Sequence, residues 1–110
     1  MEKNQAIAAL AALAHEQRIE IFRLLVKAEP AGAIAGDIAR TLDIRANTLS
    51  NSLNILSIAG LVRSMREGRS IRYFAEMEGM RRLLSFLMED CCGGRPEICQ
   101  PVLDELACSC

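Results

Sequence analysis

The chain has 110 residues and a formal net charge of −1 at pH 7, and 51% of its residues are hydrophobic. This length supports one domain with a modest core and leaves no room for two. Aromatic residues make up only 4% and Trp is absent, so the core must rely on Leu, Ile, Ala and Met, which suits helices packed on helices. No apolar run approaches the ~18–20 residues of a membrane span, so no membrane-spanning segment is expected.

The first apolar run, Ala6–Ala14, resembles the core of a signal peptide, but two features argue against a leader. Lys3 is the only basic residue before it, and the helical pattern continues beyond it through Ile21, Leu24 and Leu25. A cleaved leader needs no such continuation. We therefore expect a cytoplasmic protein.

Helical spacing of apolar residues predicts about five helices. In the first helix, Ile7, Leu10 and Leu13 or Ala14 share one face. The segment at residues 29–32 ends the second, because its proline cannot continue a helix and its glycine tolerates positive φ. The five helices are expected at about residues 4–14, 16–28, 34–41, 46–59 and 77–90.

The fourth helix is followed by a predicted β-hairpin. Leu49, Leu53, Leu56 and Ala59 are spaced by four, three and three residues, so one stripe of this helix faces the core. Gly60 is a natural helix stop. The segments Leu61–Met65 and Ile71–Ala75 have the composition of two strands around a Gly-containing turn at residues 66–70.

These elements predict a mainly α protein with a β-hairpin wing, that is, a winged helix-turn-helix. The helices at 34–41 and 46–59, joined by the turn at 42–45, form the helix-turn-helix, and its second helix enters the major groove of DNA in such folds. Residues 1–90 are expected to form this domain, and residues 91–110 a cysteine-rich tail.

The outward side chains near the start of the second helix of this pair are short and polar. Asn can bond adenine bidentately, and Ser and Thr can bond base edges or phosphates. Helix capping explains a single Asn or Ser at a helix start, but it does not require a polar cluster over three turns. The predicted DNA contacts of this helix are Arg45, Asn47, Thr48, Ser50, Asn51 and Asn54.

Arginines on the hairpin extend this candidate surface. Arg66 and Arg69 flank the tip and Arg72 lies in the returning strand. Arginine at a hairpin tip can reach phosphates or a narrow minor groove, although it can also be ordinary solvated charge. The charge distribution favours the DNA-binding interpretation, since residues 34–74 carry a net charge of +3 and residues 75–110 carry −4.

All five cysteines lie in the last twenty residues. An odd number of cysteines that includes a vicinal pair is a poor start for a disulfide framework, and clustered cysteines in a cytosolic protein more often bind metal or do redox work. A thiol cluster next to a DNA-binding domain predicts a sensor, in which a soft metal or metalloid on sulfur controls DNA binding. The candidate ligands are Cys91, Cys92 and Cys99, with Cys108 and Cys110 as further possibilities.

Several motifs resemble those of the ArsR/SmtB family of metal-responsive winged-helix repressors, over roughly residues 6–90. Ser52 departs from the family pattern, which commonly has His at that position. The matching segments are Leu10–Ile21 for the family's ALA-H/D-x-x-R-x-x-I opening, Gly36–Ala39 for its GELA helix, Leu49–Val62 for its S-x-HL-x-x-L-x-x-AGLV block, and Arg66–Arg69 with Tyr73 for its wing.

The resemblance implies a homodimer that binds a near-palindromic, double-stranded operator and releases it when an inducer binds. It also implies that the first helix and the helix at 77–90 form the dimer interface. Their apolar faces agree with this, because neither helix has another obvious surface to bury against in so small a domain.

Family members place their inducer sites at different positions. The Cys-x-Cys pair of one arsenic-sensing type is absent from residues 34–41, and the zinc and nickel sensors use His and carboxylates on the last helix. The sole histidine here, His15, lies in the opening motif and is expected to be structural. Cys91, Cys92 and Cys99 resemble the C-terminal CC…C site of some arsenite-responsive members, which implies As(III) or Sb(III) as the inducer.

The chemistry of the three thiols is consistent with that resemblance. Trivalent arsenic or antimony takes three sulfurs in a pyramid, and Gly93 and Gly94 give the backbone between the cysteines conformational freedom. Zn²⁺ prefers four ligands, so participation of Cys108 or Cys110 would favour zinc, cadmium or lead instead. Chain termini are often poorly ordered, which argues against these last two as ligands.

Two alternatives remain open from the sequence. One is a repressor of the same fold in which an oxidant joins two cysteines, and the other is a metal-scavenging protein that does not bind DNA. An enzyme is not expected, because we find no nucleophile–base pair and no phosphate-binding Gly loop. No catalytic cofactor is expected either.

Overall fold

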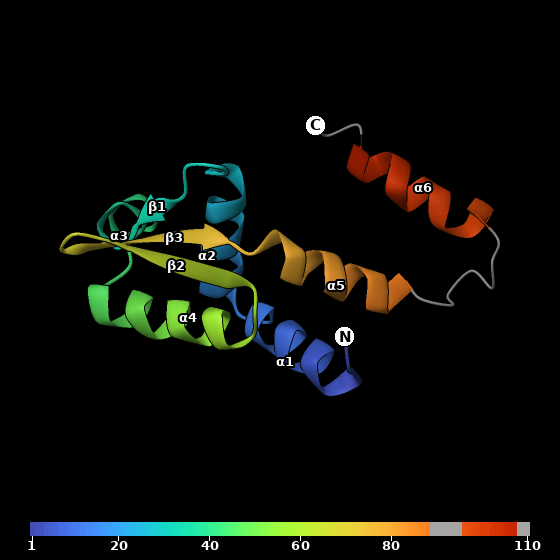
Figure 1. The fold of residues 1–110 in the computed structure, drawn as a ribbon, viewed down its shortest axis with the longest axis horizontal. Helices are drawn as coiled ribbons and strands as arrows, with labels where there is room; N and C mark the ends of the chain where they lie inside the picture. The colour runs from blue at the N-terminus through green and yellow to red at the C-terminus, as the bar shows by residue number, and fades with distance from the viewer. Residues whose placement is uncertain (89–95, 108–110) are drawn as a thin grey trace.

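A computed structural model describes residues 1–88 and 96–107 of the chain. Within these residues it has six helices and three strands (Figure 1). In chain order they are α1 (Lys3–Leu13), α2 (Glu16–Lys27), β1 (Ala33–Ile34), α3 (Ala35–Leu42), α4 (Ala46–Ile58), β2 (Val62–Glu67), β3 (Ser70–Ala75), α5 (Met77–Met88) and α6 (Pro96–Ala107).

The three strands form an antiparallel sheet in the order β1-β3-β2. The hairpin of β2 and β3 is paired from Val62 opposite Ala75 to Glu67 opposite Ser70. Its two-residue turn begins with Gly68 at a φ of 63°, and a positive φ at that position is what a type II′ turn requires. The predicted wing is therefore confirmed, with a tighter turn than the sequence indicated.

Two elements were not predicted. The short strand β1 takes up Ile34, which had been placed in a helix, so that α3 begins one residue later. Helix α6 lies in the segment expected to be a tail, where Pro101 interrupts the helical pattern. For the helix predicted at 77–90, α5 accounts for Met77–Met88, and its last two predicted positions lie outside the described residues.

The core lies between α1, α2, α4 and the base of the hairpin. Leu49, Leu53 and Leu56 on α4 are each at most 1% exposed, which confirms the predicted stripe. They belong to one buried cluster with Ile21 and Leu25 of α2. This packing leaves the opposite side of α4 to solvent.

Helix α1 packs through a different face from the one its larger side chains suggested. Ala6, Ala9 and Ala12 are buried, whereas Ile7 is 55% and Leu10 is 42% exposed. Alanines allow α1 to lie close to the core. The face with the larger apolar residues therefore remains uncovered by the part of the chain that the structure describes.

His15 and Arg18 fix the junction between α1 and α2. The backbone N–H of Gln17 donates to Nδ1 of His15 at 3.2 Å, so His15 is the N-cap of α2, and its predicted structural role is confirmed. Nε of Arg18 donates to the carbonyl oxygen of Ala12 at 2.6 Å. A cation at a helix C-terminus is also favoured by the helix dipole. Among the described residues, no helix has both the length and the apolar character to span a membrane.

Candidate nucleic-acid interface

The turn between α3 and α4 sets the direction of α4. Asp43 adopts a left-handed conformation with a φ of 53°, and the N–H of Ile44 donates to the carbonyl of Ala39 at 3.0 Å. Ile44 is 8% exposed and anchors the turn in the core. Arg45 is extended at the N-cap, and its carbonyl accepts the first helical hydrogen bond of α4, from Leu49.

The exposed side of α4 carries a polar stripe. Asn47, Ser50, Asn51 and Asn54 follow an i, i+3, i+4, i+7 spacing, which places them on one helix face. The buried positions on α4 lie on the opposite side. All six residues predicted to contact DNA from this segment are exposed, namely Arg45, Asn47, Thr48, Ser50, Asn51 and Asn54.

The amide side chains of this stripe differ in whether they form hydrogen bonds within the protein. Oδ1 of Asn47 accepts a hydrogen bond from the N–H of Thr48 at 2.9 Å, so Asn47 partly serves the start of the helix. Within the described part of the chain, the side chains of Asn51 and Asn54 have no hydrogen-bond partner. These two amides are therefore available to base edges.

Ser52 lies on the buried side of α4, between Leu49 and Leu53. It is 3% exposed and is the one buried polar residue among those described. The position at which the family commonly has His cannot contact a base in this conformation. Any base recognition by α4 must come from the exposed stripe.

The wing carries its arginines on two different faces. Arg66 pairs with Ile71 and shares its face of the hairpin with Tyr73, which lines a small cavity against α3 and α4. Arg69 lies in the turn. Both are exposed, and neither forms an ion pair within residues 1–88 and 96–107. Both guanidinium groups are therefore free to meet phosphates.

Arg72, the third wing arginine predicted to contact DNA, has partners within the protein. Its Nε lies 2.9 Å from Oε1 of Glu67 across the hairpin, and its Nη1 donates to the carbonyl of Ala31 at 3.4 Å. Arg72 thus braces the wing against the segment before β1. The neighbouring Arg63 lies 4.4 Å from the ring centroid of Phe74, on the same face as Arg72.

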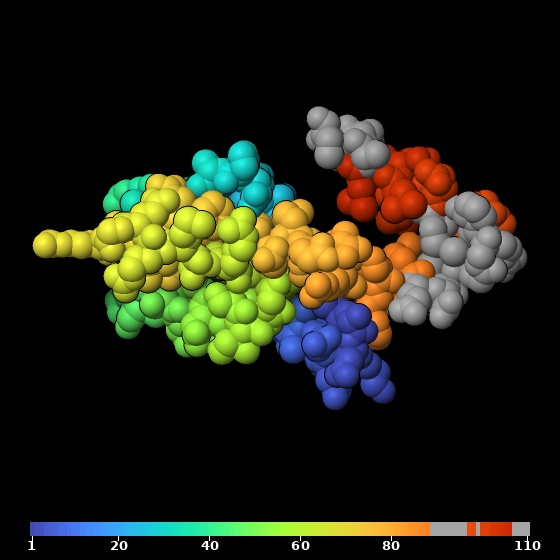
Figure 2. Space-filling model, viewed as in Figure 1, coloured from blue at the N-terminus to red at the C-terminus, as the bar shows by residue number. Residues whose placement is uncertain are grey.

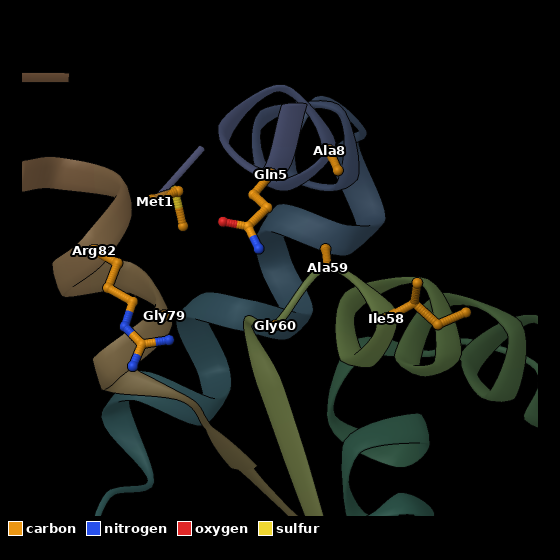
Figure 3. Close-up of a pocket in the computed structure, with 8 residues that line it drawn as sticks. All are labelled: Met1, Gln5, Ala8, Ile58, Ala59, Gly60, Gly79 and Arg82. Atoms are coloured by element: carbon orange, nitrogen blue, oxygen red, sulfur yellow. The ribbon is translucent and has the colours of Figure 1, made fainter. Parts of the chain in front are cut away.

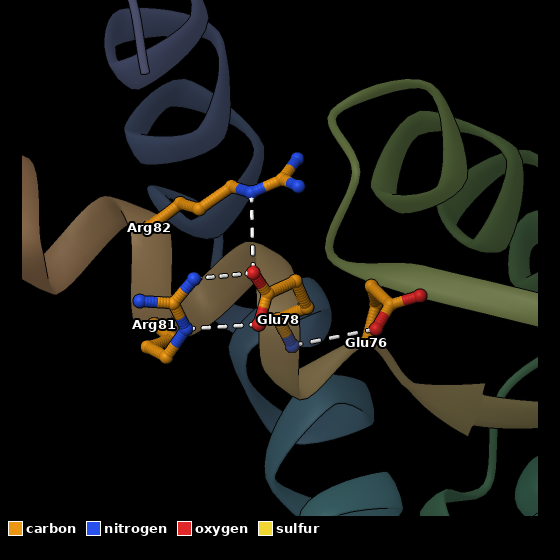
Figure 4. A network of polar contacts seen from close by, with 4 residues as sticks. All are labelled: Glu76, Glu78, Arg81 and Arg82. Atoms are coloured by element: carbon orange, nitrogen blue, oxygen red, sulfur yellow. Dashed lines mark hydrogen bonds and ion pairs between the residues drawn. The ribbon is translucent and has the colours of Figure 1, made fainter.

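The polar side of α5 forms a local ion-pair network (Figure 4). Glu78 accepts hydrogen bonds from Arg81, and its Oε1 lies 3.4 Å from Nε of Arg82. The hydrogen bond from Arg81 lowers the pKa of Glu78 from its ordinary value. These arginines are thus engaged within α5, at the end of the molecule away from the wing tip (Figure 1).

A cavity of about 230 Å³ lies where α1, the end of α4 and the start of α5 meet (Figure 3). Gln5 and Arg82 supply its polar groups. Gly60 and Gly79 also line this cavity, and Gly79 was not among the residues singled out from the sequence. Its position inside an amphipathic helix could have drawn attention to it. A glycine there costs about 1 kcal/mol of helix stability relative to Ala, so it often has a packing reason.

Four of the five predicted inducer ligands fall outside the residues that the structure describes, so their arrangement stays a prediction. Cys91, Cys92, Cys108 and Cys110 lie outside the described residues. Position 99 lies in α6. In residues 1–88 and 96–107 there is no group of three or more His, Cys, Asp or Glu residues that could hold a metal ion.

Comparisons with known proteins match this geometry. Residues 13–64 match the model of a helix-turn-helix domain family. No curated protein sequence matches the chain. An ArsR-like transcriptional regulator from Rhodococcus sp. RHA1 is 27% identical with a TM-score of 0.71, over 94% of this chain and 93% of that one.

Two further solved structures are similar. HlyU from Vibrio cholerae is 26% identical with a TM-score of 0.65, over 84% of this chain and 99% of that one. The homodimeric winged helix-turn-helix DNA-binding domain of a possible ArsR-family regulator from Mycobacterium bovis is 28% identical with a TM-score of 0.65, over 77% and 76% of the two chains. The matched helix-turn-helix domain and these likenesses show that the chain is similar to DNA-binding winged helix-turn-helix transcriptional regulators, ArsR-like ones among them.

Proposed function

We propose that the protein is a cytoplasmic repressor that binds operator DNA as a homodimer and releases it when trivalent arsenic or antimony binds Cys91, Cys92 and Cys99. The polar stripe on α4 is the observation that carries the DNA-binding part. Its four side chains are exposed on one face, whereas the apolar residues that hold α4 in place lie on the other. A helix of this kind can enter the major groove without disturbing the core.

The wing supports the same function by adding charge beside the helix. Arg66 and Arg69 project from the hairpin without intramolecular ion pairs in the described range, so their charge is available to the DNA backbone. Phosphate contacts position a protein on the duplex, and base contacts select the sequence. We therefore assign a contribution to DNA affinity to the wing and the selection of the DNA sequence to α4.

Dimerisation through α1 and α5 is supported by uncovered apolar side chains on both helices. Ile7 and Leu10 on α1 and Met77, Leu84 and Leu87 on α5 are between 42% and 55% exposed in the single chain. The similar domain from Mycobacterium bovis is homodimeric. Two copies related by a two-fold axis would present two recognition helices to a near-palindromic operator.

The inducer is proposed from the cysteine chemistry and the family resemblance. Three thiolates suit the pyramidal coordination of trivalent arsenic, and a soft ligand set disfavours hard cations. Ligand binding after α5 would then change the spacing between the two recognition helices. Cadmium, lead or zinc, or oxidation of two thiols, would act on the same segment and are the alternatives to test alongside arsenite.

The first test is the fluorescence anisotropy of labelled DNA from upstream of the protein's own gene, titrated with reduced protein in the presence and absence of arsenite. Tight, salt-sensitive binding that arsenite reverses would support the proposal. DNA binding that responds only to cadmium, zinc or oxidant would support a repressor with a different inducer. Tight thiol ligation of metal without DNA binding would favour the scavenger.

Removal of the arginine at the tip of the wing should weaken DNA binding without changing sequence preference. We expect Arg69→Ala to lower affinity for all DNA sequences and to reduce the slope of log K against log salt by about 1, because one phosphate contact is lost. Arg82→Ala removes the same charge from α5 and should leave the slope unchanged. An unchanged slope in Arg69→Ala would show that the tip of the wing does not contact DNA phosphates.

Removal of an amide from α4 should act on specificity instead. We expect Asn51→Ala to cost about 1–3 kcal/mol on the best operator and little on random DNA, because a base contact is lost and the phosphate contacts remain. Asn4→Ala, an exposed position on α1, is the matched control. Equal losses on operator and random DNA would show that Asn51 contacts the backbone, not a base.

A further inference from the structure

Helix α4 contains no charged residue, although it is the helix proposed to enter the major groove. Its sequence from Ala46 to Ile58 is ANTLSNSLNILSI, and the nearest cation in the sequence, Arg45, precedes it at the N-cap. Guanine is most often read by Arg or Lys and cytosine by Asp or Glu, whereas Asn bonds adenine through two hydrogen bonds. The side chains of α4 are therefore suited to adenine.

Helix stability does not explain the asparagines of α4. Asparagine favours a helix less than alanine does, and Asn47, Asn51 and Asn54 are all exposed, so no buried contact requires them. Asn47 partly serves the start of the helix, because its Oδ1 accepts from the N–H of Thr48. Within the described part of the chain, the amides of Asn51 and Asn54 have no hydrogen-bond partner. A contact with DNA gives these two amides a role.

The spacing of these two amides is close to that of neighbouring base pairs. Asn51 and Asn54 are three residues apart on the exposed face, which is a rise of about 4.5 Å along the helix axis. Successive base pairs of B-DNA are about 3.4 Å apart. Helix α4 lies at the surface of the molecule beside the hairpin, where Figure 2 shows it in green below the yellow strands. Each amide can therefore contact a base pair of its own.

We propose that Asn51 and Asn54 read adenines in the operator, and that a methyl group on N6 of these adenines weakens binding; this inference rests on the DNA binding of the proposed function. In the bidentate contact, N6–H of adenine donates to Oδ1 of Asn, and Nδ2 of Asn donates to N7 of adenine. The other N6 hydrogen pairs with thymine. When N6 is methylated and the base pair is kept, the methyl group replaces the hydrogen that Oδ1 accepts.

The protein cannot easily make room for this methyl group. The asparagine side chain is short, so its amide reaches a base edge only when the backbone of α4 lies close to the groove. Leu49, Leu53 and Leu56 on the opposite side of α4 are at most 1% exposed and hold the helix against the core. The methyl group therefore removes a hydrogen bond and also meets the amide oxygen. Adenine methylation in the operator thereby becomes a control of DNA binding that is independent of the cysteines.

The test begins with selection of duplexes from a random-sequence library by the full-length, reduced protein without arsenite. We expect each selected half-site to contain adenines at two neighbouring base pairs. Anisotropy titrations then compare the selected duplex with duplexes that carry N6-methyladenine at one position of both half-sites. Methylation of a contacted adenine should weaken binding at least about fivefold, because one bidentate contact is lost. Methylation outside the half-sites should change the affinity less than about twofold.

Two variants show whether the amides cause this effect. Asn51→Ala should bind the unmodified duplex more weakly, but methylation of the adenine that Asn51 contacts should then change its affinity less than about twofold. Its sensitivity to methylation of the other adenine should persist. Asn54→Ala should show the reverse pattern, so each variant is the control for the other. Alanine has the higher helix propensity, so both variants should keep α4 folded.

Three results would overturn the inference. Selected half-sites without adenine would show that the amides read another base. Equal affinity for methylated and unmodified duplexes would show that N6 is not contacted. Sensitivity that persists at both adenines in both variants would show that the methyl group acts through the DNA itself. Each of these results leaves operator binding in place, whereas selection of no sequence would contradict the proposed function, so the two failures are distinguishable.

Discussion

Arsenite is expected to weaken operator binding by the reduced, full-length protein by about 5–150-fold, the range of an allosteric coupling of 1–3 kcal/mol. Substitution Cys99→Ser should bring this effect below about twofold, because trivalent arsenic would be left with two of its three proposed thiolates. Operator affinity without arsenite should be close to that of the unsubstituted protein, since the α4 stripe and the wing are intact. The measurement is an anisotropy titration at fixed salt, with and without arsenite.

Cys108→Ser is the matched control for this prediction, because it removes one thiol from the same region but not from the proposed triad. It should keep the full response to arsenite. A full response to arsenite in Cys99→Ser would show that Cys99 is not one of the three arsenic ligands. Loss of response in both variants, together with a response to zinc or cadmium in the unsubstituted protein, would indicate a four-sulfur site of the kind that zinc prefers.

Much of the DNA-binding domain was predictable from sequence because its elements obey local rules. The stripe of Leu49, Leu53 and Leu56 has a helical period and one buried side, so the exposed polar positions of α4 followed directly from it. The hairpin was predictable because strand-forming residues flank a glycine. His15 was expected to be structural, and its role as the N-cap of α2 agrees.

The elements that sequence reasoning missed depend on distant partners. Strand β1 has two residues and exists because β3 offers it an edge, with Ala33 opposite Tyr73. The contacts of Arg72 with Glu67 across the hairpin and with the carbonyl of Ala31 were not predicted either, and its contact with DNA stays a prediction. Neither interaction leaves a periodic pattern in the sequence. The cysteine ligands stay a prediction, since Cys91 and Cys92 lie outside the described residues.

Replacement of Gly79 by Ala is expected to lower the free energy of unfolding by about 1–3 kcal/mol, the usual cost of forcing extra atoms into a packed site. A Cβ at this position would lie 2.0 Å from the carbonyl oxygen of Gly60 and 3.1 Å from its carbonyl carbon. The obstacle is backbone, so no side-chain rotation relieves it. Gly60 has a φ of +80°, and Leu61 after it is fully buried.

The backbone around Gly60 cannot easily move away from α5. The N–H of Leu61 donates to the carbonyl of Leu56 at 3.0 Å, and the carbonyl of Leu61 accepts from Glu76 at 2.8 Å. The first of these bonds ties the segment to α4 and the second ties it to the residue before α5. Accommodation of the methyl group therefore requires α5 itself to shift.

Gly36→Ala is the matched control, because Gly36 also lies in the first turn of a helix but is exposed. A Cβ there would meet only Nη1 of Arg40, at 3.5 Å, which is an ordinary contact. Helix propensity favours Ala over Gly by up to about 1 kcal/mol, so this variant should be neutral or more stable. Thermal unfolding of both variants at one fixed protein concentration makes the comparison, since dimerisation makes the Tm depend on concentration.

The position of Gly79 also predicts an effect on function beyond stability. Helix α5 packs against Gly60, just after the end of α4, and it carries Leu84 and Leu87 of the proposed dimer face. A shift of α5 would therefore change the distance between the two recognition helices of the dimer. At a temperature where Gly79→Ala is still folded, its operator affinity should fall while its affinity for a single half-site is retained. Equal affinity of Gly79→Ala and Gly36→Ala for the full operator would show that the contact between Gly60 and α5 does not set that spacing.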